Sequence, residues 1–301
     1  MINNLIIKIA FLFTNNKFIE NYVINNFKYF KYAGKSKNIV LVEFHGWSFN
    51  NIVNSYLANF LAKKYSAKIH SYPGYVLNKY TLDLYSKIKF IISNFLPIKT
   101  FLIYKSFGVK KFFYQKLSKS KKIEAFKIFE NKIKSIKNIE NIVTLKINKV
   151  LIGDLIYDSF LKYYNEPTID LKSKKFQNFL YESIKNFVYW EDYLKKNNIK
   201  AIVITHAVYN GAIPMRIAIE KFKKITVWSG ELYGVCNYSK NFSYGWLNFK
   251  NFDTEFKKLS PNQKKLAMKI AEKKIFNRLN GIKNDGDMHA AKISPYSKIF
   301  Q

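Results

Sequence analysis

The pattern that decides the fold lies in residues 38–72, which read NIVLVEFHGWSFNNIVNSYLANFLAKKYSAKIHSY. The first stretch, Asn38–Phe44, is a short apolar run that follows a polar, lysine-rich segment, which is typical of a buried strand. A loop follows, and apolar residues then recur at helical spacing through Asn51–Tyr65. Ala67–Tyr72 predicts a second strand, closed by a Pro-Gly turn. A strand–helix–strand unit of this length is the building block of a parallel α/β sheet.

A second unit of the same kind follows residue 200. Ala201–Thr205 predicts a strand, and His206–Asn210 predicts a loop. Gly211–Phe222 predicts a helix, and Lys224–Trp228 predicts the next strand. We therefore expect all four strands in one mainly parallel sheet with helices on both faces, a Rossmann-like α/β fold.

Helical periodicity continues through much of the remaining chain. Further helices are predicted at Leu77–Phe95, from Ile123 to Ile136, at Asp154–Tyr164, at Lys175–Lys196 and at Ser260–Leu279, with a strand at Ile142–Ile147 and an aromatic, loop-rich stretch at Ser229–Phe252. The last helix carries a full start signal, in which Ser260 is the cap and Gln263 completes a capping box. We expect three parts: an N-terminal helical segment (1–37), the α/β domain (38–280), and a polar segment (281–301) that is a tail or begins a further domain.

The 301 residues carry a formal charge of +31, from 51 basic and 20 acidic side chains. Only Arg216 and Arg278 are arginines, and the accompanying excess of Lys, Asn, Ile, Phe and Tyr is typical of an AT-rich genome. A protein that reads bases relies on the planar guanidinium of arginine, so nucleic acid is not an expected partner. Weak attraction to anionic lipid, or to an anionic substrate, is the expected consequence of the lysine surplus.

Several classes of protein are excluded by what the sequence lacks. The apolar run Leu5–Phe13 is nine residues long and contains Lys8, so it is too short to cross a membrane, and no signal-peptide pattern is visible. The expected location of the protein is therefore the cytoplasm or the inner face of the membrane. The single Cys236 excludes a disulfide framework. No dinucleotide, P-loop, zinc-protease or nucleophile-elbow motif is present, so we expect neither a metal nor a bound cofactor.

Two histidines occupy equivalent positions in the two predicted units. His45 follows the strand that ends at Phe44, and His206 follows the strand that ends at Thr205. Ligands of open parallel sheets bind beyond the carboxyl ends of the strands, where a histidine is suited to general-base catalysis near neutral pH. The alternative is that each histidine caps its strand and bonds to the next turn.

Two further groups of polar residues are candidates for substrate binding. Asp154 and Asp158 are four residues apart on one predicted helix face, with Tyr157 beside them; the simpler interpretation makes Asp154 the helix cap. Arg216 lies in the helix that opens after Asn210-Gly211, where free N–H groups favour an anion. The simpler interpretation of Arg216 is a buried ion pair, with Glu220 as the expected partner.

Three stretches together resemble bacterial capsule and surface-polysaccharide biosynthesis proteins, specifically the N-terminal part of glycosyltransferase-like proteins of the GT-B type. These stretches are VEFHGWSFNNIVNSYLANFLAKK (Val42–Lys64), IGDLIYDSFLKYYNEPTID (Ile152–Asp170) and AIVITHAVYNGAIPMRIAI (Ala201–Ile219). The resemblance implies two Rossmann-like domains facing a cleft, of which this chain supplies the acceptor-side half. It also implies a nucleotide sugar as donor, a glycan or lipid-linked acceptor, and no metal.

The resemblance further implies roles for particular residues. His45 is the first candidate for the base, and His206, Tyr209 and Arg216 line the cleft. Asp154, Tyr157 and Asp158 hold sugar hydroxyls, and Trp47 and Glu231 are further candidates for substrate binding. We expect the half to be inactive alone and to expose aromatic residues on its cleft face, namely Trp47, Tyr209, Tyr233 and Trp246. The alternative function is a non-catalytic scaffold of the same pathway that binds glycan or lipid-linked sugar.

Overall fold

The computed structural model describes residues 17–30, 34, 36–44, 48–73, 88, 91–92, 95, 99–205, 207–231, 234–241, 252–280 and 282. Two compact units are present, Met1–Gly245 and Trp246–Gln301, and each is considered by itself. The division falls within the range predicted for the α/β domain, and the predicted borders at residues 37 and 281 stay predictions. The predicted helix at Leu77–Phe95 lies almost entirely outside the described residues.

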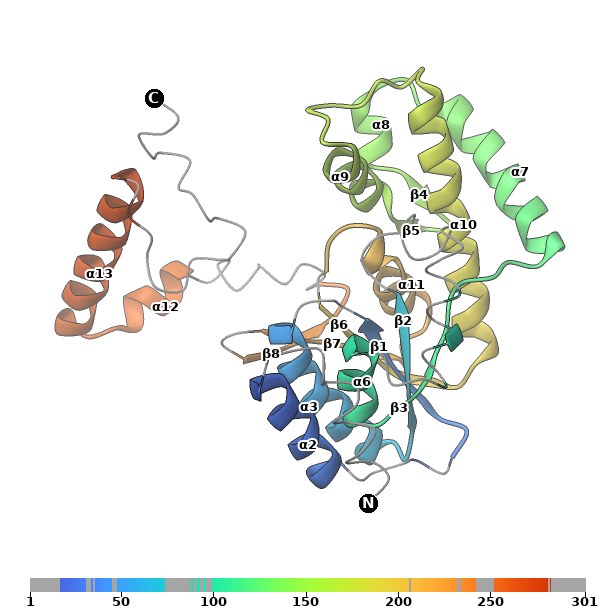
Figure 1. Cartoon of the computed structure of the whole chain (residues 1–301). Coiled ribbons are helices and arrows are strands. Elements are labelled where there is room, and N and C mark those ends of the chain that lie inside the picture. The colour runs from blue at the N-terminus through green and yellow to red at the C-terminus, as the bar shows by residue number, and fades with distance from the viewer. Residues whose placement is uncertain are drawn as a thin grey trace. The chain divides into compact units, whose positions relative to one another are not determined.

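The centre of the first unit is a mainly parallel sheet (Figure 1). Its strands in spatial order are β3 (Val109–Phe112), β2 (Lys68–Pro73), β1 (Ile39–Phe44), β6 (Ile199–Ile204), β7 (Thr226–Glu231) and β8 (Gly234–Tyr238). All neighbouring pairs are parallel except β7 and β8. With the short β4 and β5 set aside, this is the strand order of the Rossmann fold, with an antiparallel last strand. The predicted fold class is confirmed.

Helices cover both faces of the sheet (Figure 1). One face packs against α3 (Ser48–Lys64) and α6 (Lys99–Ser106), with α2 (Lys17–Tyr29) packed on α6, and the other packs against α10 (Lys174–Lys196) and α11 (Ile213–Lys221). The second core extends beyond the sheet, where α7 (Lys119–Ser135) and α9 (Gly153–Tyr164) pack on α10 and α8 (Ile139–Val143) packs on α9. Alternate residues of β1 enter opposite cores: Val40 and Val42 join the first, whereas Ile39 and Leu41 join the second. Burial on both faces explains why this strand is a continuous apolar run.

The strand predicted at Ile142–Ile147 is mostly wrong. Residues 139–143 form α8, because Asn138 and Asn141 make a reciprocal capping box that starts a helix there. Only Lys146–Ile147 forms a strand, β4, which pairs with β5 (Val150–Leu151). The two residues between them, Asn148 and Lys149, have φ values of 49° and 72°, as a tight primed hairpin turn requires.

The loop predicted from Ser229 is also wrong over its first part. Residues 229–231 continue β7, and β8 then pairs antiparallel with it from Gly234 to Tyr238. Burial alternates along β8, where Val235 is exposed and Cys236 and Tyr238 are buried. This two-residue period is typical of an edge strand with one covered face.

The second unit contains α12 (Phe252–Lys258) and α13 (Pro261–Leu279). The predicted capping box at the start of α13 is confirmed. The Ser260 N–H donates to Gln263 Oε1 at 2.9 Å, and the Gln263 N–H donates to Ser260 Oγ at 3.3 Å.

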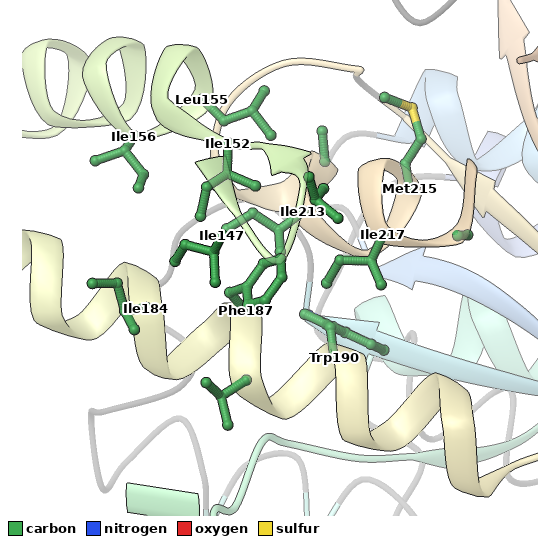
Figure 2. Close-up of a cluster of buried hydrophobic side chains, with 14 of the residues drawn as sticks. Ile147, Ile152, Leu155, Ile156, Ile184, Phe187, Trp190, Ile213, Met215 and Ile217 are labelled. Atoms are coloured by element: carbon green, nitrogen blue, oxygen red, sulfur yellow. The ribbon is translucent and has the colours of Figure 1, made fainter. Parts of the chain in front are cut away.

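A large apolar cluster fixes the elements that carry the candidate site (Figure 2). Phe187 of α10 lies beside Ile152, which directly precedes α9, and Ile213 at the start of α11, and Trp190 of α10 lies beside Ile217 of α11. All five side chains are almost completely buried. Burying a side chain of this size contributes about 1.5–3 kcal/mol. The starts of α9 and α11 are therefore held against α10 by packing.

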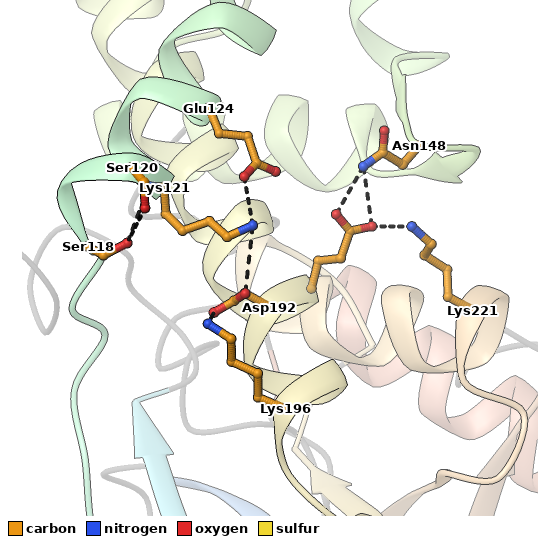
Figure 3. A network of polar contacts seen from close by, with 9 residues as sticks. Ser118, Ser120, Lys121, Glu124, Asn148, Asp192, Lys196 and Lys221 are labelled. Carbon is orange, nitrogen blue, oxygen red and sulfur yellow. Dashed lines mark hydrogen bonds and ion pairs between the residues drawn. The ribbon is translucent and has the colours of Figure 1, made fainter.

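Ion pairs on the outer surface add little to this packing (Figure 3). Lys121 of α7 lies 2.7 Å from Glu124 and 3.7 Å from Asp192 of α10. The neighbouring Glu191 accepts a hydrogen bond of 3.0 Å from Asn148 in the β4–β5 turn. These groups are partly solvated, so each pair contributes at most about 1 kcal/mol.

His70 in β2 makes the stability of the fold depend on pH. Burial and the nearby charges of Lys111 and Lys68 lower the pKa of His70 to about 4. The unfolded chain binds a proton there near pH 6.5, whereas the folded chain does not, so acid favours unfolding. We expect this residue to cost up to about 3 kcal/mol of stability as the pH falls from 6.5 to 4.

Urea denaturation of the natural chain and of His70→Gln at pH 7.5 and at pH 4.5 checks this expectation. The free energy of unfolding of the natural chain falls more between the two pH values than that of the variant. Equal losses in the two proteins would show that His70 does not contribute.

Candidate functional site

The two strands that precede the predicted catalytic histidines lie side by side. β1 and β6 are parallel neighbours, with Val42 opposite Val203. The chain leaves β1 through α3 on one face of the sheet, and it leaves β6 through α11 on the other face. Neighbouring strands whose connections leave to opposite faces define a topological switch point, where α/β sheets bind ligands beyond the carboxyl ends of the strands.

The histidines themselves, His45 and His206, lie outside the described residues, as do Trp47, Tyr233 and Trp246. Phe44 ends β1 directly before His45, and Thr205 directly precedes His206. Because β1 and β6 run in the same direction, the chain leaves both at the same edge of the sheet. That His45 and His206 serve one site stays a prediction.

Glu43 is a residue of this edge that the sequence reasoning missed. It is the last residue but one of β1, and it is only 1% exposed. Its Oε2 accepts a hydrogen bond of 2.6 Å from the Thr205 N–H, and its backbone oxygen accepts one of 2.9 Å from the Tyr104 hydroxyl. The carboxylate thus ties the end of β1 to the end of β6. A single acidic residue within an apolar run was the available signal, because carboxylates are rarely buried without a partner.

Arg216 forms a buried ion pair, but its partner is not the expected one. Its Nη2 lies 2.7 Å from Asp154 Oδ2, and the side chains are 6% and 17% exposed, respectively. Glu220, the partner expected from sequence, pairs instead with Lys240 at 3.0 Å. Asp154 is also not the helix cap, because α9 begins at Gly153 after Ile152, without a side-chain cap. The pair joins the first turn of α9 to α11.

The other two predicted residues of α9 lie near this pair. Partial burial raises the pKa of Asp158, and the neighbouring Asp154 raises it further. Asp158 is nonetheless largely exposed, so its carboxylate is open to a ligand. Tyr157 is half-buried against the core on the α10 side of the sheet.

The loop after β6 is held against α9 and α10 through Asn210. The Asn210 N–H donates to Ser159 Oγ of α9 at 2.7 Å. Its side-chain amide donates to Ser183 Oγ of α10 at 3.1 Å, and its backbone oxygen accepts from Asn186 at 3.3 Å. Residues 210–212 form the short helix η1, which leads into α11.

Tyr209, the residue before η1, has a strained backbone. Its φ of 61° and ψ of 178° fall in a region that is essentially restricted to glycine. Lys162 Nζ of α9 lies 4.4 Å from the centroid of its ring, a cation–π contact. The strain persists because the next residue, Asn210, is bonded to α9 and α10, and because Lys162 of α9 contacts the ring.

Replacing Tyr209 with glycine relieves this strain, and we expect it to raise the free energy of unfolding by about 1 kcal/mol. Tyr209→Ala is the control, because it loses the same ring but keeps a Cβ, and we expect it to lower stability. Urea denaturation of the two variants measures the difference. If glycine and alanine lower stability equally, Tyr209 is not strained.

The structure therefore places the predicted residues along α9. Arg216 pairs with Asp154 in its first turn, Asp158 lies one turn further on, and Tyr209 contacts Lys162 in its last turn. Glu231 is the last residue of β7 and lies opposite Gly234 of β8. Its side chain is not among the described parts of the chain. The assigned roles of these residues stay predictions.

Searches against protein-family models, curated proteins and solved structures give no match. In the described parts of the chain, no cluster of three or more His, Cys, Asp or Glu side chains is arranged to hold a metal ion. Within those same residues, no helix combines the length and apolar character that a membrane span needs.

Proposed function

We propose that the chain is the acceptor-side half of a glycosyltransferase in surface-polysaccharide biosynthesis. It acts with a nucleotide-sugar donor and a glycan or lipid-linked acceptor, at the inner face of the cytoplasmic membrane. The observation that supports this function best is the switch point between β1 and β6, beyond which His45 and His206 follow. The three stretches that resemble capsule biosynthesis proteins contain the carboxyl ends of β1 and β6, both histidines and the Asp154–Arg216 pair.

In this proposal the acceptor hydroxyl attacks the anomeric carbon of the donor sugar. A new C–O bond forms as the bond between that carbon and the diphosphate oxygen breaks, and the diphosphate leaves with the electron pair. His45 takes the proton of the hydroxyl as general base. The Glu43–Thr205 hydrogen bond positions the two chain segments that carry His45 and His206.

The Asp154–Arg216 pair has a positioning role in this scheme. The guanidinium is buried and bonded to a carboxylate, which weakens its attraction for a phosphate. By joining α9 to α11, the pair sets the position of the loop that contains Tyr209. The more exposed Asp158 is the carboxylate of this group that contacts sugar hydroxyls.

Binding of the purified chain to an array of bacterial surface glycans tests the proposed function. We expect a defined set of glycans to bind, and transfer of sugar from a panel of nucleotide sugars only when the donor-side half is added. Glycan binding without transfer, with the donor-side half present, would favour the scaffold. Absence of glycan binding would contradict both functions.

A further inference from the structure

The second unit has apolar side chains that its own described residues leave uncovered. None of the described residues in this unit is buried, and six large apolar side chains of α13 are 48–64% exposed. They are Leu266, Met268, Ile270, Ile275, Phe276 and Leu279. A helix owes most of its stability to an apolar face packed against a neighbour, and large exposed apolar patches mark surfaces that bind a partner. The apolar side chains of α13 therefore indicate a contact surface.

The apolar and basic residues of α13 form two neighbouring rows. Four apolar residues recur at intervals of three or four positions and so share one face of the helix. They are Met268, Ala271, Ile275 and Leu279. Three exposed lysines, Lys265, Lys269 and Lys273, are four positions apart and form the second row. The helical repeat places the two rows about a third of a turn apart, so the lysines flank the apolar face.

The charge of α13 indicates which partner fits this surface. The helix carries five lysines and one arginine but only one acidic residue, Glu272. A second copy of the helix would bring like charges together, and a nucleic acid would leave the apolar face in water. An anionic lipid surface attracts the basic residues and also takes up the apolar side chains. Six basic residues among 19 are too many for a span, so the helix would lie in the plane of the membrane surface.

We propose that α13 binds the surface of an anionic phospholipid membrane. Met268, Ile275 and Leu279 enter the boundary between headgroups and acyl chains, and the row of lysines contacts the lipid phosphates. The long lysine stems lie along the apolar boundary while their ammonium groups stay in water. The proposal rests on the membrane location in the proposed function and names the element responsible for it.

Flotation of the whole chain with lipid vesicles tests this proposal. One set of vesicles contains one part phosphatidylglycerol to two parts phosphatidylcholine, and the other contains phosphatidylcholine alone. We expect the chain to bind the anionic vesicles and to bind the neutral ones at least about 100-fold more weakly. The triple variant Lys265→Gln/Lys269→Gln/Lys273→Gln should also lose about 100-fold, since each basic residue near an anionic surface contributes about a factor of five.

A second triple variant controls for the positive charge of the chain as a whole. Lys119→Gln/Lys122→Gln/Lys127→Gln removes the same charge from three exposed lysines of α7. Charges away from the bound surface are screened by salt, so we expect this variant to bind anionic vesicles within about 3-fold of the natural chain. Equal losses in the two triple variants would show that the attraction is diffuse, and would overturn the proposal.

Two leucines of α13 test the apolar face in the same way. Leu279→Gln removes a side chain that enters the bilayer, and we expect vesicle binding to weaken about 10-fold. Leu266→Gln is the matched control, because Leu266 is 60% exposed, against 59% for Leu279, but lies outside the apolar row. We expect it to change binding less than about 2-fold. Circular dichroism checks that both variants keep their helices, and equal losses would contradict the assigned face.

Sedimentation velocity and the glycan array separate the remaining outcomes. If Leu279→Gln converts a dimer of the natural chain into a monomer, the apolar face binds a second copy and the proposal is wrong. Absence of vesicle binding by the natural chain would overturn this proposal while glycan binding still supports sugar transfer. Vesicle binding that depends on α13, without any glycan binding, would support this proposal and contradict the proposed transferase.

Discussion

Replacing His45 with alanine is expected to lower the turnover number of the complete transferase by about 10²- to 10⁴-fold. A general base contributes a rate factor of this size, because the acceptor hydroxyl must lose its proton as the new bond forms. His45 follows the end of β1, next to the end of β6, at the edge where parallel sheets bind their ligands. The measurement is sugar transfer at saturating donor and acceptor, with circular dichroism to check that the fold is retained.

His70→Gln is the control for this experiment. His70 lies within β2 and is assigned no catalytic role, so its replacement should leave turnover at neutral pH unchanged. Unchanged turnover in His45→Ala would remove His45 from the role of base. If His206→Ala instead shows the large loss, the base is the histidine that follows β6.

Replacing Asp154 with alanine is expected to lower the free energy of unfolding by about 2–4 kcal/mol. The Arg216 guanidinium is almost fully buried, and the variant removes the carboxylate that lies 2.7 Å from it. Removing one member of a buried ion pair costs much more than the pair contributes when intact, because the remaining charge loses its compensation. Urea denaturation at pH 7 measures the loss.

The double variant Asp154→Ala/Arg216→Met separates this effect from packing. It removes both charges and keeps an apolar side chain along α11, so we expect it to be less destabilised than the sum of the two single variants. Glu220→Ala, which breaks the more exposed pair with Lys240 on the same helix, should cost less than about 1 kcal/mol. Additive losses in the double variant would show that Asp154 and Arg216 are not coupled.

Local periodicity predicted the helices and strands whose apolar residues recur with the period of the faces that the fold buries. β1 and β6 are apolar runs because both faces of the sheet are covered, and α3, α10 and α13 follow helical spacing or a capping box. The strand predicted around Ile142 was mostly wrong because the capping box at Asn138 favours a helix more strongly than the β-branched residues favour a strand. β8 was missed because its alternation is short and lies in an aromatic, glycine-containing stretch.

The candidate site was harder to predict because its contacts join residues that are distant in sequence. Asp154 and Arg216 are 62 positions apart, and no local pattern indicates that α9 packs against α11. The sequence offered a buried ion pair as the simpler of two interpretations of Arg216, but the partner it suggested was Glu220, one turn along the same helix. Glu43 and Thr205 are 162 positions apart, and only the pairing of β1 with β6 brings them together.

Hydrogen exchange with and without a bound glycan tests the central claim, that the carboxyl edge of β1 and β6 is the ligand site. We predict slower exchange of backbone amides in peptides that cover residues 43–50 and 204–212 when a glycan selected on the array is present. Peptides from the outer surface of α7 should exchange at the same rate in both states. Protection confined to α7, to the second unit or to the amino ends of the strands, with no change at residues 43–50 and 204–212, would contradict the account.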